Sequence, residues 1–240
     1  MNPVQAKIAR AVMQLVSVTA FIFLWPIVLR AAMAKAFWPV KAVKLLPADT
    51  PADPSIADLV ARDTPQLLAL GFEGPVHMAR SNANHSETVI AFINQQHRCA
   101  LLIEPWLHPK RHDSQAISYF SRLQDGRVVW SEVMSSDGGA FSTPTHHAAA
   151  INAQDLTEQL QQHLAHVRAE AGHSSPVSLG PDDLQRQLGA GADSTIRELV
   201  SLNKLRMDAD GAARPTMRFA LRLLHENWRA PSVAPAAVRL

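Results

Sequence analysis

An uncharged apolar stretch near the N-terminus constrains this chain more than any other feature. Between Arg10 and Arg30 stand 19 residues, and none of them carries a charge. As a helix they would cover about 28 Å at ~1.5 Å per residue, close to the ~30 Å hydrocarbon core of a bilayer. A core helix of a water-soluble domain rarely runs so far without a charge. We therefore expect a single transmembrane helix from Ala11 to Leu29, with everything after it folding in water.

A cleaved secretory signal is the main alternative to a retained anchor. Lys7 and Arg10 form a positive region before the stretch, and Ala34-Lys35-Ala36 or Ala32-Met33-Ala34 has the small-x-small pattern of a cleavage site. However, the stretch is longer than the ~7–15 apolar residues of an ordinary signal, and Arg30 and Lys35 stand where a neutral region is expected. These departures favour the retained anchor.

The basic residues around the predicted helix indicate its orientation. Lys7 and Arg10 precede it, and four basic residues follow it: Arg30, Lys35, Lys41 and Lys44. Because basic flanks prefer the cytoplasmic side, the count predicts a single-pass protein, as in a bacterial inner membrane, with a cytoplasmic body. If the helix instead behaves as an ordinary signal anchor, the body faces the other compartment.

The composition of the whole chain is that of a folded protein. Hydrophobic residues make up 47% of the 240 residues and charged residues 18%, which excludes wholesale disorder. The net charge is +2 and the basic residues are scattered, so no nucleic-acid partner is expected. Cys99 is the only cysteine, so no intrachain disulfide can form, and its apolar neighbours predict a buried thiol.

Residues 55–173 are predicted to form an α+β domain with an antiparallel sheet. Five runs rich in Val, Ile, Phe and Leu predict strands: Val76–Ala79, Thr88–Ile93, Arg98–Ile103, Ala116–Arg122 and Arg127–Val133. Asp125-Gly126 predicts a tight hairpin turn, and the polar residues 94–97 predict a second hairpin, so neighbouring strands are expected to form a meander.

Two helices are predicted to cover one face of this sheet. The first extends from Ser55, a possible N-cap, to Leu70, and Pro65 is expected to break or restart it. The second follows Asn152, another possible N-cap, with Leu156, Leu160, Leu164 and Val167 along one stripe. A Pro-rich linker over residues 47–54 is expected to separate this domain from the anchor and its flanks, residues 1–46.

Residues 174–240 are predicted to form a small, mainly helical C-terminal region. Three short helical patterns occur there: Asp182–Leu188, Thr195–Leu205 and Thr216–Trp228. A turn or small hairpin tip is expected at Arg206–Gly211, between the last two. The order helix, helix, tip, helix is loosely like a winged-helix arrangement.

Histidine is the one enriched side chain among the groups that carry chemistry, with 11 residues. His163 and His166 are three residues apart on the predicted helix, His146 and His147 precede it, and His173 follows it. Grouped imidazoles can bind zinc, but His163 and His166 are expected at the solvent edge of the helix. His108 and His112 have helical spacing, yet Pro109 between them indicates a loop. We therefore assign no metal site.

Two further patterns favour ordinary structural roles. Ser201-Leu202-Asn203-Lys204 matches the Ser-x-x-Lys of penicillin-recognising enzymes, but the companion motifs are absent. The segment Arg214–Arg229 places Met217, Ala220, Leu221, Leu224 and Trp228 on one face with arginines around it. Such a segment suits a membrane surface or a partner's groove, and it equally suits packing on its own domain, which we favour because of Glu226.

Phosphate loops, Cys-x-x-Cys pairs, nucleophile elbows and His-Glu-x-x-His helices are all missing, so we assign no catalytic or cofactor-binding residue and expect no cofactor. The sequence favours a membrane-anchored accessory protein that binds another protein, and an enzyme is the less favoured class. One alternative is an enzyme with a site built from scattered residues such as His77, His85, Asp125 and Glu132. The other alternative is a membrane-bound regulator whose C-terminal region, loosely like a winged helix, binds nucleic acid, although the net charge of +2 over residues 181–240 supports it only weakly.

Overall fold

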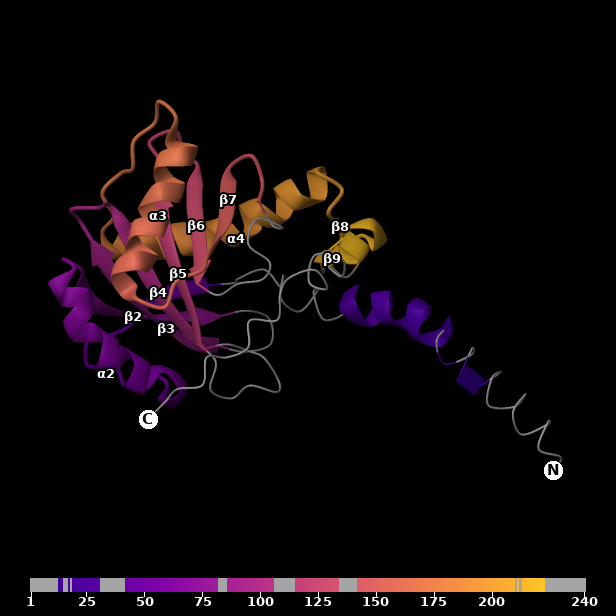
Figure 1. Cartoon of the computed structure of the whole chain (residues 1–240), viewed down its shortest axis with the longest axis horizontal. Helices are drawn as coiled ribbons and strands as arrows, with labels where there is room; N and C mark the ends of the chain where they lie inside the picture. Colours follow the sequence, from indigo (N-terminus) through magenta and orange to yellow (C-terminus); the bar gives the residue numbers. More distant parts are fainter. Residues whose placement is uncertain are drawn as a thin grey trace.

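The computed structural model describes residues 13–14, 17, 19–30, 42–81, 86–105, 115–133, 142–209, 211 and 213–222 (Figure 1). These residues form an α+β fold around a seven-stranded sheet with the order β1-β2-β3-β4-β5-β6-β7. The strands are β1 (Ala42–Leu45), β2 (Glu73–Ser81), β3 (Ser86–Asn94), β4 (Cys99–Pro105), β5 (Gln115–Arg122), β6 (Val128–Val133) and β7 (His146–Ile151).

Neighbouring strands pair in antiparallel fashion except β6 and β7, which are parallel. The predicted meander over β2–β6 is confirmed, and so are both predicted hairpins. Gly126 has φ 88°, the left-handed conformation that the turn between β5 and β6 requires. The edge strands β1 and β7 were not predicted. β1 pairs with β2, so residues 42–45, which the sequence placed in the flank of the anchor, belong to the sheet.

The two predicted helices lie on one face of the sheet, as expected, but a third helix, which the sequence assigned to the separate C-terminal region, covers the opposite face. Along β3, Ile90 and Phe92 point to the face that carries α2 (Pro54–Ala69) and α3 (Leu156–Ala171). Val89, Ala91 and Ile93 point to the opposite face, where α4 (Pro181–Ser201) crosses (Figure 1). A strand that is apolar on both sides needs cover on both sides, which explains the second layer.

α2 continues through Pro65, where the sequence predicted a break. Proline removes one backbone donor and strains the preceding turn. The helix nevertheless buries Ile56, Leu59 and Leu67 against the sheet, on both sides of the proline. Tertiary packing therefore outweighs the local preference.

α3 begins later than predicted. Asp155 is its N-cap rather than Asn152, and the Asp155 carboxylate accepts hydrogen bonds from the backbone N–H groups of Thr157 and Glu158. Gln66 of α2 donates to the same carboxylate over 3.1 Å, which joins the two helices. The cap thus fixes both where α3 starts and how it lies beside α2.

The C-terminal part consists of α4, a small hairpin and a final helical segment. α4 merges the first two predicted helical patterns, because it continues through Gly189 and Gly191. The predicted turn at Arg206–Gly211 is the tip of the hairpin formed by β8 (Leu205–Met207) and β9 (Ala213–Pro215). Residues 217–222 are helical and pack through Phe219 and Ala220.

Residues 19–30 are helical and expose large apolar side chains on several sides. The predicted transmembrane span from Ala11 to Leu29 lies only partly within the described residues. Among those residues, no helix combines the length and the apolar character needed to cross a bilayer.

Candidate functional site

Several histidines that the sequence singled out lie where α3 packs on β5, β6 and β7. His163 of α3 is completely buried and His166 is half-buried, so the expectation that both lie at the solvent edge is wrong for His163. Gln159, one turn before His163, is buried as well. The buried stripe of α3 therefore contains polar side chains among the apolar ones, and these need hydrogen-bond partners from the sheet.

Two serines of the sheet supply partners for the buried imidazole. His163 Nε2 lies 2.9 Å from Ser121 Oγ on β5, and His163 Nδ1 lies 2.9 Å from Ser131 Oγ on β6. Ser131 Oγ is also 3.0 Å from Nδ1 of His166. Each of the two serines is fully buried. We call these four residues, Ser121, Ser131, His163 and His166, the serine–histidine chain.

The donors and acceptors of the serine–histidine chain can be assigned by elimination. Ser121 Oγ donates to the carbonyl oxygen of Arg98 at 3.3 Å, so it must accept from His163 Nε2–H. The Nδ1 atom of a neutral His163 then accepts from the Ser131 hydroxyl, and Ser131 Oγ in turn accepts from His166 Nδ1–H. All the hydrogen bonds thus run in one direction, from His166 to a backbone carbonyl. His163 must be neutral for this arrangement to hold, because its Nδ1 atom accepts a hydrogen bond, whereas His166 can donate from Nδ1 in either protonation state.

Burial favours the neutral form of both histidines. Desolvation, with a smaller contribution from the neighbouring His166, lowers the pKa of His163 to about 3. Desolvation also lowers the pKa of His166, against the effect of Glu170. Both side chains are therefore uncharged near neutral pH.

Tyr119 extends the polar layer toward α2. Its ring stacks on His163 with 5.4 Å between ring centroids, and its hydroxyl donates to Gln159 Oε1 at 3.4 Å. The amide nitrogen of Gln159 donates to the carbonyl oxygens of Ala153 and Gln154, at 3.2 and 3.3 Å. The Gln159 side chain therefore holds the backbone of the loop that precedes α3.

The geometry of Ser131 and His163 is that of a nucleophile and its base, but their burial is not. A hydroxyl 2.9 Å from an imidazole nitrogen is close enough to be deprotonated. A nucleophile must also be reached by its substrate, and Ser131 has no exposed surface. In this conformation the serine–histidine chain orients α3 on the sheet and cannot attack a substrate.

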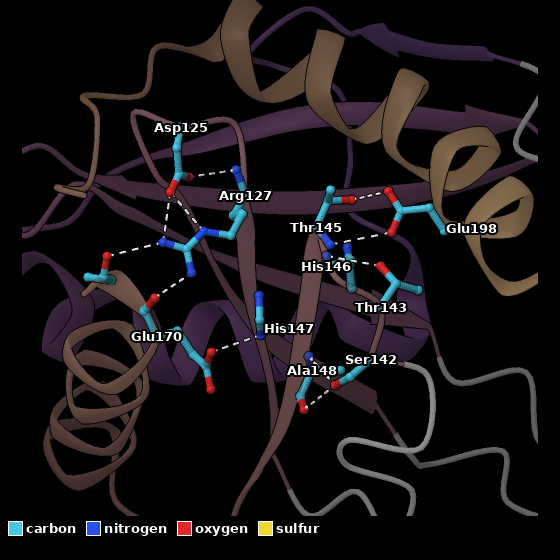
Figure 2. A network of polar contacts seen from close by, with 11 residues as sticks. Asp125, Arg127, Ser142, Thr143, Thr145, His146, His147, Ala148, Glu170 and Glu198 are labelled. Carbon is cyan, nitrogen blue, oxygen red and sulfur yellow. Dashed lines mark hydrogen bonds and ion pairs between the residues drawn. The ribbon is translucent and has the colours of Figure 1, made fainter. Parts of the chain in front are cut away.

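A second network surrounds β7, where adjacent histidines point to opposite faces of the sheet (Figure 2). His147 Nδ1 lies 2.8 Å from Glu170 of α3. His146 stacks on Trp130 with 6.0 Å between centroids, near Glu198 of α4. Burial lowers the pKa of His146 to about 4, although Glu198 opposes this shift.

Side chains at and just before the start of β7 tie it to helices on the two faces: His147 contacts α3, and Thr145 contacts α4. Thr145 binds the Glu198 carboxylate through its hydroxyl and, at 3.3 Å, through its backbone N–H. Burial raises the pKa of Glu198, but hydrogen bonds from Thr143 and Thr145 outweigh it, so the net shift is downward. Ser142 Oγ accepts from Ala148 N at 2.8 Å and donates to Ala148 O at 3.0 Å (Figure 2). These bonds occupy backbone groups of an edge strand that would otherwise be open to pairing.

The scattered residues that the sequence combined into a hypothetical enzyme site do not meet. His77 lies on β2, and Glu132 lies on β6, where it accepts from Trp130 Nε1 at 3.2 Å. With three strands between them, at ~4.8 Å per strand, the two strands are about 19 Å apart. Asp125 is in the exposed turn and pairs with Arg127, whose guanidinium also caps α3 through the carbonyls of residues 170 and 171 (Figure 2). His85 lies outside the described residues.

The other residues that the sequence analysis considered for a catalytic or metal site make ordinary structural contacts or lie outside the described residues. Ser201 Oγ donates to the carbonyl of Glu198 at 2.8 Å, whereas Lys204 Nζ donates to the carbonyl of Ser142 at 2.9 Å. In the part of the chain that the structure describes, no three His, Cys, Asp or Glu side chains are placed to hold a metal ion. His108 and His112 lie outside that part. Cys99 is fully buried, as predicted, and burial raises the pKa of its thiol to about 12.

Two hollows open at the surface. A polar cleft of about 280 Å³ lies between α2 and the start of α3, and its lining includes Arg62, Asp63 and Asp155. A groove of about 310 Å³ lies between α4 and the β8–β9 hairpin. We call this second hollow the α4 groove; its apolar lining is Ile196, Val200, Met207 and Ala213, and Asp193 and Arg197 flank it.

Comparisons of the chain with known protein families, with curated proteins and with solved structures find no match.

Proposed function

We propose that this chain is a single-pass membrane-anchored accessory protein, whose folded body binds another protein. The observation that carries the proposal is the helix over residues 19–30. Phe21, Phe23 and Leu24 are 60%, 70% and 57% exposed, and Ile22, which points to yet another side of the helix, is 60% exposed. Water disfavours such a surface by about 25 cal/mol per Å², whereas lipid does not. This exposed apolar surface supports placing the helix in lipid rather than in water.

The folded body supports a binding role more than a catalytic one. Ser131 and His163, which have the spacing of a nucleophile and its base, are fully buried and hold α3 on the sheet by their hydrogen bond. The α4 groove offers what a protein partner needs, an apolar floor with a charge of each sign at its edge. Met207, which lines it, is half exposed and can change rotamer to fit a bulky side chain.

A photo-crosslinking amino acid at position 207 in the full-length chain tests the proposed partner. The matched control is the same amino acid at Leu68, which is as exposed as Met207 but lies on α2, outside the α4 groove. We expect one crosslinked species of defined mass from position 207 in membranes and none from position 68. Crosslinks of equal yield from both positions, or from neither, would contradict the proposal.

The basic residues around the predicted span indicate on which side of the membrane the folded body lies. We propose that the body is cytoplasmic, because four basic residues follow the predicted span and two precede it. Reporter fusions at Leu240, one active only in the cytoplasm and one only outside it, test this orientation. Activity of the outside reporter alone would overturn the orientation and leave the anchor intact.

A further inference from the structure

We propose that the last described helical segment docks on an anionic lipid surface through a face made of Met217, Arg218, Leu221 and Arg222, which we call the C-terminal face. This proposal rests on the membrane anchoring proposed above, and it adds a second point of contact between the body and the bilayer. It names lipid headgroups of negative charge as the ligand.

The first support is how the segment divides its side chains. Phe219 and Ala220 are buried, and the Phe219 ring lies 5.7 Å from Lys204 Nζ. Intramolecular packing, which the sequence favoured, therefore uses these two residues. Met217 and Leu221, which the sequence placed on the packed face, are instead 42% and 50% exposed. Within residues 217–222, the packing on the domain therefore does not bury Met217 or Leu221.

The second support is the chemistry of the exposed side. Met217 and Leu221 are four residues apart and are therefore neighbours on the helix surface, and so are Arg218 and Arg222. Both arginines are exposed. An apolar pair beside a cationic pair is the pattern of helices that lie in the interface of an anionic membrane. A protein partner would more often bury a face with fewer charges.

The third support is the contrast of charge with α4. Residues 202–222 contain five basic and two acidic residues, whereas α4 contains two basic and four acidic ones. Within residues 202–222, Asp208 is held by Arg206 and Arg214, at 3.2 and 2.5 Å. The positive charge is thus concentrated at the end of the described chain, where the C-terminal face lies.

A fluorophore at position 221 tests the proposal in the full-length chain. Leu221→Cys is labelled with a polarity-sensitive dye, and Cys99 should stay unlabelled because it is fully buried and burial raises the pKa of its thiol to about 12. The protein is placed in nanodiscs of phosphatidylcholine, alone or partly replaced by phosphatidylglycerol. Leu68→Cys is the matched control, since Leu68 is 52% exposed and belongs to α2.

We expect the dye at position 221 to shift to the blue and resist an aqueous quencher in anionic discs only, and the dye at position 68 to do neither. Adding Arg218→Gln or Arg222→Gln should lower the ratio of docked to free protein by about fivefold each, and high salt should lower it further. A dye at position 221 that stays in water in both kinds of disc overturns the proposal. Burial of the dye that is the same in neutral discs, or that depends on protein concentration, overturns it in favour of plain apolar insertion or of a second copy.

The same experiment separates this proposal from the anchor. If the protein does not enter the discs, the proposed anchoring fails, and discs are then added to the free protein. The dye at position 221 still reports whether the C-terminal face binds anionic lipid, so a blue shift there supports the face without the anchor. If no blue shift occurs, the proposal that the C-terminal face binds anionic lipid is overturned.

Discussion

α2 and α3 have the same length, 16 residues, and lie on the same face of the sheet, but they are held there by different forces. α2 is seated by apolar side chains, chiefly Ile56, Leu59 and Leu67. α3 adds a buried layer of hydrogen bonds through Gln159 and His163. The difference teaches that the position of α2 depends mainly on apolar packing, whereas the position of α3 also depends on buried donors meeting their acceptors. We expect the stability contributed by the packing of α3 on the sheet to depend on pH, and the stability contributed by the packing of α2 not to depend on it.

The largest expected effect on stability comes from removing an apolar side chain between α2 and the sheet. Leu67→Ala removes a fully buried side chain and leaves a cavity, so the free energy of unfolding should fall by about 2–5 kcal/mol. Because no titrating group lies in the change itself, the loss should be the same at pH 5 and pH 7. Urea unfolding at the two pH values measures this, and a loss that differs between them would weaken the contrast with α3.

The next effect is expected where α3 packs on the sheet, and it depends on pH. Burial lowers the pKa of His163 to about 3, from an ordinary 6.5. Between these values the unfolded chain binds a proton that the folded chain does not, so this stability is complete above pH 6.5 and is lost as the pH falls toward 3. The free energy of unfolding should decrease by at most about 1.4 kcal/mol per pH unit for this one histidine.

His163→Gln sharpens that expectation, because glutamine keeps an amide donor and acceptor but does not titrate in this range. The variant should lose part of the acid sensitivity. His146, whose pKa burial lowers to about 4, should account for part of what remains. An unchanged slope in His163→Gln would mean that His163 is not the buried neutral group described here.

The serine–histidine chain gives the next prediction. Ser131→Ala removes the hydroxyl that donates to His163 and accepts from His166, so at least one buried nitrogen loses its partner. The expected loss is about 1–3 kcal/mol. Ser118→Ala is the control, because Ser118 is also buried but lies on β5 outside the serine–histidine chain. Thermal unfolding of both variants at pH 7 measures the difference, and equal losses would argue against a special role for Ser131.

The smallest effect is expected at the start of α3. Asp155→Ala removes the N-cap and the bond to Gln66, both of which are exposed to solvent. The melting temperature should fall slightly, and hydrogen exchange should quicken in the first turn of α3 but not in α2. Faster exchange throughout α2 would show that the two helices are held together mainly by this cap.

The sequence predicted the centre of the sheet better than its edges. β2 to β6 are rich in β-branched and aromatic residues and are joined by recognisable turns, so periodicity was enough. β7 has the sequence His-His-Ala-Ala-Ala-Ile, which has little preference for a strand, and it is held by a parallel neighbour and by side chains such as Ser142. β1 has only four residues, too few for a clear alternation of apolar and polar side chains. Such strands are decided by tertiary contacts.

The buried polar layer could have been found only in part. His163 stands three residues after Leu160 and four before Val167, so helical spacing alone places it in the buried stripe. Its partners Ser121 and Ser131 are 42 and 32 positions away, and no local signal joins them to it. Predicting the pair would have required the register of β5 and β6 against α3.

The central claim, a single retained anchor from Ala11 to Leu29, is tested most directly by one measurement on the full-length chain. Membranes from producing cells are extracted with alkaline carbonate, and the mass of the chain that remains in the pellet is determined. The account predicts that the chain stays in the pellet with its N-terminal residues intact. Release into the supernatant, or a mature chain that begins near Lys35 or Phe37, would contradict it.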